Sequence, residues 1–415
     1  MSALNPFYAS TRFADKKLHL GISGSVAAYK ILDLLRSFIK LQIRVSATLT
    51  EGAQRFISPL LVRSLGAKPV YGNLFENVEE LFAHLEPGAG ADAFLIAPAS
   101  ANILARLAAG FADDMLAAQC LAFNGPLALA PAMNPRMWAN TATQNNVAIL
   151  KDRGCRIVEP EKGETACGEV GRGRLADLQE IFLQTLSVLS GQDMRGMSVM
   201  VTMGPTREMW DGARFFSNAS SGLMGSALAT SAWLRGAKVY AICGPGVDIY
   251  LPAEVIRVDV SNAREMAEQA RQIWPRVRLG MFCAAVADFA PQRPKNANDL
   301  KIRKTEYADS FEIVMERNPD ILATCAKSRM VGQKVLGFAA EITKDMSSLT
   351  PLAREKLNKK GADLIAANRI NAADGSFGAM ESSMAVVDKN GLEEIWGPMS
   401  KADIAWELCS WLLRM

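Results

Sequence analysis

The sequence predicts an α/β protein with two domains in tandem, and three observations lead to this prediction. At 415 residues, the chain has room for two or three domains of about 150 residues each. Short apolar runs alternate with amphipathic helical stretches along the chain. A strand, a glycine-containing turn and a helix start occur together twice, at residues 18–30 and 198–225. Two such starts predict two nucleotide-binding domains.

The composition is that of a globular protein with a sizeable core in each half. Hydrophobic residues make up 49% of the chain and charged residues 21%, which excludes a largely disordered chain. A net charge of +3 is too small to indicate a nucleic-acid or membrane-surface partner. From the sequence we expect no secretory signal. We also expect no membrane-spanning helix, because no apolar stretch reaches about 18 residues. The seven cysteines lie singly, which favours free thiols in a reducing, cytoplasmic compartment.

Three apolar runs and one segment of alternating apolar and polar residues in the first half predict strands of a parallel sheet with helices on both faces. They lie at residues 18–22, 43–49, 93–97 and 127–130, and a helical pattern over residues 27–40 follows the first. Small, hydroxyl and amide residues come directly after these strands: Gly24-Ser25, Thr50, Ser100-Ala101-Asn102 and Met133-Asn134. Because ligands of open α/β sheets bind at the carboxyl ends of the strands, we expect these residues to meet at one edge.

The predicted edge is poor in charge, and its chemistry suits a phosphate group beside a flat ring. Backbone N–H groups and Ser or Thr hydroxyls hold phosphates, and small residues allow a ring to approach the backbone. The loop from Gly21 to Ser25 also has a simpler explanation. Gly and Ser are common in strand-to-helix turns for backbone reasons alone, so this loop by itself is weak evidence of a ligand.

The two histidines of the chain have different predicted roles. His19 lies within the first predicted strand and is expected to be structural. His84 lies at a predicted helix end before the strand at residues 93–97. Such a histidine is usually a surface or capping residue. Its closeness to the ligand-facing loop also makes it a candidate base, because His titrates nearest to neutral pH.

Cys167 lies in the Gly-rich stretch GETACGEVGRGR, which lacks apolar periodicity. This pattern predicts a mobile loop outside the core. A thiol on such a flap can act as a proton donor or redox partner that closes over a site. The alternative is an incidental exposed cysteine.

The division between the domains is predicted near residue 190. An amphipathic helix over residues 174–189 closes the first half, and Ser190-Gly191-Gln192-Asp193 breaks its pattern. Further strands are predicted in the second half, at residues 197–203, 237–243, 254–260, 279–285, 333–338 and 362–366. A hairpin turning at Lys389-Asn390-Gly391 and a helix over residues 401–413 complete a Rossmann-like domain.

The basic residues of the second half have two possible roles. Lys301, Arg303 and Lys304 follow a Pro- and Asn-rich loop, and three further lysines fall on one predicted helix: Lys356, Lys359 and Lys360. A solvated helix face is the usual explanation for such lysines. Together with Asp288 at a strand end, they also suit a triphosphate and a metal ion. The sequence has no GxxxxGK[ST], which excludes a P-loop enzyme.

Six motifs occur in order through the first half: GISGSVAAYK, His84, APASAN, ARLAAGFADDML, PAMNPRMW and TACGEVGRGR. In this order they resemble the flavin-dependent phosphopantothenoylcysteine decarboxylase family. The resemblance implies a flavodoxin-like flavin-binding domain over residues 1–190. It implies that FMN contacts Ser23, Gly24, Ser25, Val26, Thr50, Ser100, Ala101, Asn102, Ile103 and Ala132. It also implies His84 as the base, Asn134 as the residue that positions the substrate carboxylate and Cys167 as the acid, while FMN supplies the redox chemistry.

The second half carries the ordered motifs GPTRE, SNASSG, AAVADF, KIRK, NPDI, GFAAE, AREKL and DLIAAN. They resemble phosphopantothenate–cysteine ligase, which is fused behind the decarboxylase in bacteria. The resemblance implies that residues 191–415 use CTP and Mg²⁺ to join cysteine to 4'-phosphopantothenate through an acyl-cytidylate. It implies that CTP contacts Phe282, Cys283, Ala284, Asp288, Lys301, Pro319, Asp320, Ile321, Leu322, Phe338, Lys356 and Lys360. Lys301 would stabilise charge, Asn218 would assist cysteine attack, and Asp288 would hold the metal.

The ligase resemblance has departures. Leu223 stands where the family usually has Lys, and Met209 and Ala219 also differ from the usual residues. The family further implies a homo-oligomer, with decarboxylase trimers joined through ligase dimers into a dodecamer. The alternatives are an FMN-binding regulatory protein and another flavin-dependent cysteine decarboxylase-like protein with an impaired ligase half. A nicotinamide oxidoreductase is disfavoured because neither half has GxGxxG followed by an acidic residue at the second strand end.

Overall fold

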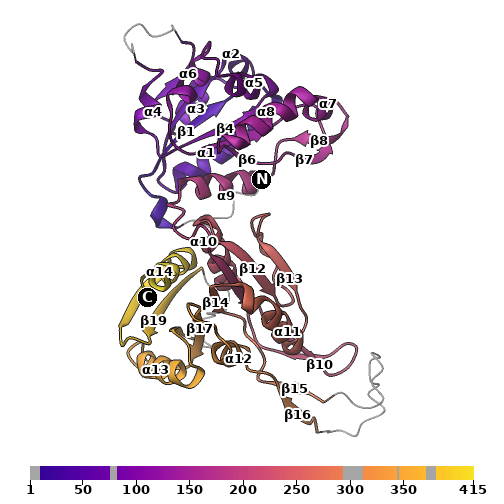
Figure 1. Cartoon of the computed structure of the whole chain (residues 1–415), viewed down its shortest axis with the longest axis vertical. Coiled ribbons are helices and arrows are strands. Elements are labelled where there is room, and N and C mark those ends of the chain that lie inside the picture. Colours follow the sequence, from indigo (N-terminus) through magenta and orange to yellow (C-terminus); the bar gives the residue numbers. More distant parts are fainter. Residues whose placement is uncertain (1–9, 75–81, 293–311, 344, 371–379) are drawn as a thin grey trace. The chain divides into compact units, whose positions relative to one another are not determined.

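The computed structural model describes residues 10–74, 82–292, 312–343, 345–370 and 380–415. The chain divides into two compact units, Met1–Gln192 and Asp193–Met415 (Figure 1). Both are α/β units, as the sequence predicted. In the described part of the chain, no helix is both long and apolar enough to cross a membrane.

The first unit is built on one parallel sheet. Its strands are β1 (Lys17–Ile22), β2 (Arg44–Leu49), β3 (Val70–Tyr71), β4 (Ala93–Ala99), β5 (Leu127–Pro131) and β6 (Arg156–Ile157), and a separate antiparallel hairpin consists of β7 (Glu161–Glu164) and β8 (Val170–Arg174). Its helical segments are η2 (Thr11–Phe13), η3 (Val26–Lys30), α1 (Ile31–Lys40), α2 (Glu51–Gln54), α3 (Pro59–Ser64), α4 (Glu86–Gly90), α5 (Ala101–Ala109), α6 (Met115–Ala122), α7 (Pro135–Ala139), α8 (Thr141–Asp152) and α9 (Leu178–Leu189).

The strand order of this sheet is β3-β2-β1-β4-β5-β6. This is the order of Rossmann sheets, whereas flavodoxin sheets have the order 2-1-3-4-5. The α/β class is confirmed, and the narrower flavodoxin-like description is refined to a Rossmann order. The chain reverses its winding direction between β1 and β4, and such a point is where doubly wound sheets bind ligands.

The second unit has an eight-stranded mixed sheet. Its strands are β9 (Ser198–Met203), β12 (Lys238–Cys243), β13 (Ile256–Asp259), β14 (Leu279–Phe282), β17 (Lys334–Glu341), β18 (Leu364–Arg369), β19 (Glu381–Asp388) and β20 (Glu393–Ser400). Two small hairpins pair β10 (Arg207–Met209) with β11 (Phe215–Ser217) and β15 (Phe289–Pro291) with β16 (Met315–Arg317). Its helical segments are α10 (Leu223–Leu234), α11 (Ala263–Ile273), η4 (Trp274–Arg276), α12 (Ile321–Lys327), α13 (Leu349–Lys360) and α14 (Lys401–Arg414).

The large sheet runs in the order β13-β12-β9-β14-β17-β18-β19-β20. Its first six strands are parallel, and β19 and β20 continue it as an antiparallel hairpin. The hairpin turns at Lys389-Asn390-Gly391 as predicted, because Asp388 Oδ1 accepts hydrogen bonds from the N–H groups of Asn390 and Leu392. Here too the winding direction reverses beside the first strand, between β9 and β14.

The apolar cores follow the predicted periodicity. In the first unit, buried side chains from β4, β5, α5 and α8 pack together, among them Ile96, Leu129 and Val147. In the second unit, the cluster reaches from β9 and β12 across to α13 and β19, and Trp274 lies within it. Burying such side chains stabilises each unit by about 25 cal/mol per Å² of apolar surface removed from water. These cores hold the strand ends, and therefore the loops after them, in fixed positions.

Three sequence predictions of local structure need correction. The helix predicted over residues 174–189 begins only at Leu178, because Asp177 caps it and Arg174 belongs to β8. The helix predicted over residues 27–40 begins with a 3-10 turn, Val26–Lys30, before α1. The Gly-rich stretch around Cys167 is an antiparallel hairpin, β7 and β8, with Cys167 between its strands.

Candidate active sites

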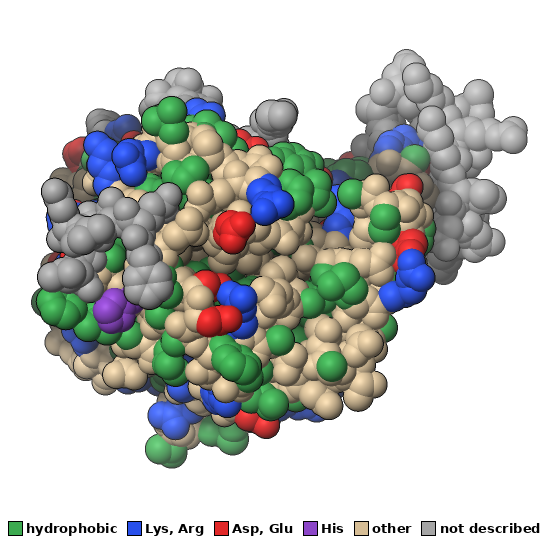
Figure 2. Space-filling model, turned by 90° about the horizontal axis from the view of Figure 1, so that it is seen from above, with side chains coloured by type: hydrophobic (Ala, Val, Ile, Leu, Met, Phe, Trp, Pro, Cys, Tyr) green, Lys and Arg blue, Asp and Glu red, His purple; other side chains and the backbone are tan. Residues whose placement is uncertain are grey.

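A pocket of about 950 Å³ lies at the carboxyl ends of β1, β2 and β4 in the first unit. Seven of the ten residues predicted to bind FMN line it: Ser23, Gly24, Thr50, Ser100, Ala101, Asn102 and Ile103. They come from three separate loops, so the predicted convergence at one edge is observed. Figure 2 views the molecule from the side of α2 and α5, and this face is mostly uncharged, with a few acidic and basic side chains close together near its centre.

Ser23 joins the two strands at which the sheet changes direction. It is buried, its hydroxyl donates to the carbonyl of Pro98 over 2.7 Å, and it accepts from the N–H of Ser100 over 2.8 Å. Both bonds tie the end of β1 to the end of β4. Ser23 therefore shapes the pocket, and its hydroxyl hydrogen is already used within the protein.

The other hydroxyl residues at this edge are helix caps. Thr50 Oγ1 accepts from the N–H of Ala53, and Ser100 Oγ accepts from the N–H of Ile103. Ser25 caps the 3-10 turn η3 in the same way. Each cap satisfies one N–H of a first helical turn and leaves others unused by the helix. At α5, which is nine residues long, these N–H groups border the pocket and suit an anion.

Two glycines allow the loops after β1 and β2 to touch. A Cβ atom on Gly24 would lie 3.1 Å from the backbone of Gly52, and one on Gly52 would lie 3.3 Å from the Cα of Gly24. At these distances the facing backbone would have to move by a few tenths of an ångström. Glycine at both positions therefore lets these two walls of the pocket touch without such a displacement.

Ser25, Val26 and Ala132, which complete the predicted set, do not line the pocket. Val26 is exposed, and Ala132 is buried, with its N–H donating to the carbonyl of Ala99 over 3.1 Å. Arg106 lines the pocket although the sequence analysis assigned it no role. It forms ion pairs with Asp113 and Asp114, so it brings little net positive charge to the site.

His84 is half-buried in a turn that leads into α4, one residue before Leu85. Ala83, the residue before it, is buried against Tyr71 and Met115. The predicted position at a helix end is therefore close to what is observed. His84 is not among the residues that line the pocket at β1, β2 and β4.

Asn134 and Cys167, which are 33 residues apart in the sequence, meet at the hairpin of β7 and β8. Asn134 Nδ2 donates to Cys167 Sγ over 3.2 Å and to Glu169 Oε2 over 3.1 Å. Its Oδ1 accepts from the N–H of Arg136 over 2.8 Å, which caps α7. The same carboxylate of Glu169 accepts two hydrogen bonds from the Arg136 guanidinium. Asn134 Nδ2 and Arg136 together thus already bind one carboxylate.

Glycines bring β8 onto the loop that carries Asn134. A Cβ atom on Gly171 would lie 2.6 Å from Pro135 Cβ, and one on Gly173 would lie 2.6 Å from the carbonyl oxygen of Met133. The carbonyl of Gly173 also accepts from the N–H of Met133 over 2.9 Å. The alternation of glycine in GRGR, which the sequence analysis took for a mobile loop, is thus explained by close packing of two backbones.

Hydrogen bonds lower the pKa of the exposed Cys167 thiol. The causes, in order, are the Thr165 hydroxyl, the N–H of Glu169 and the amide of Asn134, opposed by slight desolvation and by the charge of Glu169. The pKa of Glu169 is lowered as well, by hydrogen bonds from Asn134 and Arg136. A thiol of lowered pKa is a better proton donor and a more reactive nucleophile near neutral pH.

Replacing Thr165 with Val is expected to raise the pKa of Cys167. The hydroxyl lies 3.2 Å from the sulfur and 3.0 Å from the carbonyl oxygen of Glu169, and turning its hydrogen from that carbonyl to the sulfur stabilises the thiolate, which a methyl group of the same size cannot do. The midpoint of the pH dependence of iodoacetamide alkylation at Cys167 should therefore shift to higher pH. Mass spectrometry of the labelled peptide measures this, and a Cys167→Ser variant identifies the background from the six other free thiols. An unchanged midpoint would contradict the role of Thr165.

Thr165, Glu169 and Arg136 were not predicted from the sequence. Both motifs that contain them were recognised, but nothing local shows that Arg136 and Glu169 face each other. The available signal was an acidic residue two positions after Cys167 and a basic residue two positions after Asn134. Such a pair across two predicted loops is a weak hint of proximity.

In the second unit, the loops after β9 and β14 lie together at the point where the winding reverses. The N–H groups of Cys283 and Ala285 donate to the carbonyls of Thr202 and Gly204 over 3.1 and 2.9 Å. Asn218, which follows β11, donates through Nδ2 to the carbonyl of Val286 over 3.0 Å. The structure therefore places Asn218 against Val286, two residues after the predicted contacts Phe282, Cys283 and Ala284.

Other predicted residues surround the start of α12. Asp320 caps this helix by accepting from the N–H of Ala323, and its carboxylate contacts the ammonium group of Lys360 on α13. Lys356 lies one turn earlier on α13, 3.8 Å from Glu341. Phe338 on β17 follows Gly337, which is paired with Phe282 of β14. These residues come from α12, α13 and β17.

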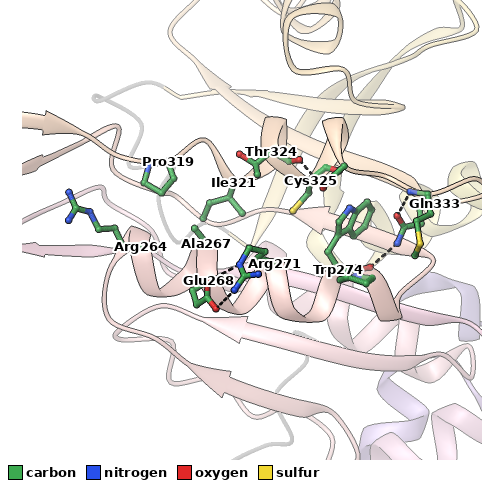
Figure 3. A pocket seen from close by; sticks show the side chains of 13 residues that line it. Arg264, Ala267, Glu268, Arg271, Trp274, Pro319, Ile321, Thr324, Cys325 and Gln333 are labelled. Atoms are coloured by element: carbon green, nitrogen blue, oxygen red, sulfur yellow. Dashed lines mark hydrogen bonds and ion pairs between the residues drawn. The ribbon is translucent and has the colours of Figure 1, made fainter.

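A pocket of about 480 Å³ lies between α11 and α12, and Figure 3 shows its lining. Of the predicted nucleotide contacts, Pro319 and Ile321 line it, beside Trp274 and Cys325 (Figure 3). Asp320 points instead to Lys360. Pro319 and Ile321 therefore face this pocket, whereas the Asp320 carboxylate between them faces α13.

The remaining residues singled out in the predicted nucleotide site are the basic residues near Lys301, the metal candidate Asp288, and Leu223. Lys301, Arg303 and Lys304 lie outside the described residues. Asp288 is exposed, and among the described residues no group of three or more His, Cys, Asp or Glu side chains is arranged to hold a metal ion. Leu223 is the first residue of α10, directly after Gly222, whose φ of 73° is left-handed.

Two family models match the chain. The model described as "Flavoprotein" matches residues 8–190. The model described as "DNA/pantothenate metabolism flavoprotein C-terminal domain" matches residues 194–415, which is more than half of the chain.

The chain is also similar to curated proteins over nearly its whole length. It is 37% identical over 396 residues to the coenzyme A biosynthesis bifunctional protein CoaBC of Vibrio vulnificus, which covers 95% of this chain and 96% of that protein. It is 38% identical over 386 residues to the protein of the same name from Escherichia coli K12, with coverage of 92% and 91%. A crystal structure of the C-terminal domain of a protein of that name is 32% identical, covers 53% of this chain and 96% of that chain, and has a TM-score of 0.43.

Proposed function

The chain belongs to the family of coenzyme A biosynthesis bifunctional proteins, and from this membership we propose how its two units divide the work. It is a bifunctional enzyme with phosphopantothenate–cysteine ligase and phosphopantothenoylcysteine decarboxylase activities. Its first half is a flavoprotein domain, and its substrates are small molecules. We assign decarboxylation to residues 1–190 and ligation to residues 191–415.

We propose that the flavin is FMN and that it binds in the pocket beside β1, β2 and β4. A volume of about 950 Å³ suits a cofactor of this size, since such pockets measure roughly 300–1,000 Å³. Gly24 and Gly52 provide close backbone approach, and the N–H groups at the start of α5 suit a phosphate. Gly24, Thr50 and the run Ser100–Ile103 would hold the cofactor, whose bound form supplies the redox chemistry for loss of carbon dioxide.

The observation that carries the decarboxylase proposal is the meeting of Asn134 and Cys167, whose Nδ2 and Sγ atoms lie 3.2 Å apart. A neutral amide can hold the substrate carboxylate by donating hydrogen bonds. The carboxylate of Glu169 accepts from Asn134 Nδ2 and so shows how this amide binds a carboxylate, and the substrate carboxylate would take its place. Cys167 then stands beside the reacting carbon as the proton donor, and His84 acts as the base.

We propose that the second unit binds CTP around the ends of β14 and β17. The carboxylate of 4'-phosphopantothenate attacks the α-phosphate of CTP, which forms an acyl-cytidylate and releases pyrophosphate. The amino group of cysteine then attacks the acyl carbon and releases CMP. Lys356 and Lys360 neutralise phosphate charge, Lys301 stabilises charge in the first step, and Asn218 assists the second.

A magnesium ion with the nucleotide is part of this proposal. Mg²⁺ is usually held by one or two carboxylates together with substrate phosphates, so a dedicated cluster of acidic residues is not required. The exposed Asp288 directly follows the loop that Asn218 contacts. One carboxylate at this place suits a metal that arrives with the triphosphate.

We further propose a cytoplasmic homo-oligomer in which decarboxylase trimers are joined through ligase dimers into a dodecamer. The free state of all seven cysteines supports a reducing compartment. Sedimentation equilibrium of the full chain measures the assembly, and a monomer at micromolar concentration would contradict it.

Two measurements test the proposed functions in the full chain. We expect the purified protein to show the absorption spectrum of FMN, and protein that stays colourless after incubation with FMN would refute the first assignment. We expect pyrophosphate release from CTP, in the presence of 4'-phosphopantothenate and cysteine, to exceed release from ATP. Release from CTP no greater than background would refute the second assignment.

A further inference from the structure

A hydrogen-bonded network of buried polar side chains in the first unit ends at the residue before His84. His19 on β1 lies with its Nδ1 2.8 Å from Ser46 Oγ and its Nε2 3.0 Å from Thr48 Oγ1. Thr48 Oγ1 donates to Gln119 Oε1 over 2.6 Å. Gln119 Nε2 in turn donates to the carbonyl oxygen of Ala83 over 3.1 Å. His19, Thr48 and Gln119 are all fully buried.

The direction of every hydrogen bond in this network of side chains follows from the group at its end, the carbonyl oxygen of Ala83. A carbonyl oxygen only accepts, so Gln119 must present its amide N–H to Ala83 and its Oε1 to Thr48. The Thr48 hydroxyl hydrogen is then used on Gln119, and the bond between His19 and Thr48 must be donated by His19 Nε2. Burial lowers the pKa of His19 to about 3, against a smaller opposing effect of the Gln119 side chain, so the ring is neutral. A neutral ring with Nε2–H accepts at Nδ1 from the Ser46 hydroxyl.

The carbonyl of Ala83 needs this partner because of Pro87. In the turn that enters α4, the N–H groups of Leu85 and Glu86 both donate to the carbonyl of Phe82. The next carbonyl, that of Ala83, would accept from residue 87 in a helical pattern, but proline has no N–H. Gln119 supplies the missing donor from α6. Without it, a buried carbonyl would lack its protein donor at a cost of roughly 1–3 kcal/mol.

The carbonyl that Gln119 holds belongs to the peptide bond between Ala83 and His84. Since a peptide unit is planar, fixing its oxygen also fixes the direction of the His84 N–H and the start of the His84 residue. We propose that Gln119 is a positioning residue that orients His84 through this peptide bond, with Thr48 and His19 holding the Gln119 amide in place. The inference rests on the proposed role of His84 as the base of decarboxylation.

The first test replaces Gln119 with Met in the full-length enzyme. Methionine fills a similar volume but donates no hydrogen bond, so the peptide before His84 is released. We expect kcat of decarboxylation to fall roughly 10- to 100-fold with KM changed by less than about twofold, as for misplaced or unsupported catalytic groups. Ligation should stay unchanged. The matched control is Gln184→Met, a buried glutamine of α9 that bonds to Arg156, and its decarboxylation should match the wild type.

A second variant, Gln119→Glu, separates positioning from packing. A protonated Glu side chain accepts from Thr48 and donates to Ala83, whereas a carboxylate cannot donate to the carbonyl. The ratio of variant to wild-type kcat should therefore be highest at low pH and fall as pH rises. A ratio that is independent of pH, or a variant that fails to fold, would overturn the proposal.

The double variant His84→Asn with Gln119→Met shows whether Gln119 acts through His84. If it does, the double variant decarboxylates no more slowly than His84→Asn alone, because the two changes are not additive. Additive losses, or an unchanged kcat in Gln119→Met, would overturn the inference. Failure of the base assignment itself is seen separately, as full decarboxylation by the single variant His84→Asn.

Discussion

Replacing His84 with Asn is expected to lower the rate of decarboxylation by roughly 10²- to 10⁴-fold, the usual contribution of a general base. Asn keeps a polar side chain of similar reach but cannot take up a proton near neutral pH. His84 is half-buried at the turn before α4, and the peptide bond before it is held by Gln119, so the substitution changes little else. Release of carbon dioxide from 4'-phosphopantothenoylcysteine measures the effect.

Ligation by the His84→Asn variant is expected to equal that of the wild type. The two activities are assigned to separate compact units, Met1–Gln192 and Asp193–Met415, and His84 belongs to the first. The flavin absorbance and thermal midpoint of the variant serve as controls for folding. Loss of both activities in a folded, flavin-containing variant would contradict the separation, and unchanged decarboxylation would remove His84 from the role of base.

The strands and the meeting of their ends were predictable because both depend on local signals. The continuous apolar runs of β4 and β5 identify buried parallel strands, and Ser100 and Thr50 identify helix starts directly after strands. Parallel strands end at one edge, so residues that follow them converge whatever the order of the strands. Seven of ten predicted flavin contacts line one pocket for this reason.

The role of each side chain within that pocket was not predictable in the same way. Ser23 was predicted as a ligand of the cofactor, yet its hydroxyl connects β1 to β4 through Pro98 and Ser100. The partner atoms lie more than 70 residues away, and no local pattern specifies them. A hydroxyl after a strand has the same appearance in the sequence whether it caps a helix, joins two loops or binds a phosphate.

The hairpin of β7 and β8 was missed for a physical reason. Its strands are short and exposed, so they carry no alternation of apolar and polar residues. Its stability comes from close packing of Gly171 and Gly173 on the loop with Asn134, which is a tertiary effect. Glycine normally weakens strands, so residue propensities predict a loop for GEVGRGR. The buried network of His19, Thr48 and Gln119 is equally hidden, because its members come from β1, β2 and α6.

Asn218→Ala is expected to separate the two halves of the ligase reaction. Pyrophosphate release in the first turnover should continue, while formation of the cysteine amide should fall by roughly 10²- to 10³-fold, as when one donor to a developing charge is removed. Asn218 lies at the meeting of the loops after β9 and β14, and one hydrogen of its Nδ2 is used on the carbonyl of Val286. The other hydrogen and Oδ1 are the groups proposed to act on the incoming cysteine.

Rapid-quench measurement of pyrophosphate and amide product from CTP, 4'-phosphopantothenate and cysteine distinguishes the two halves. The matched control is Asn262→Ala, which removes an asparagine of the same unit that caps α11 by accepting from the N–H of Glu265 over 2.9 Å. Losing that cap costs about 1 kcal/mol of stability but should leave both halves of the reaction intact. Equal loss of pyrophosphate and amide by Asn218→Ala would place Asn218 in nucleotide binding or in the structure of the loop. Loss of the amide alone requires that the acyl-cytidylate forms and waits for cysteine, so the intermediate should then accumulate on the enzyme.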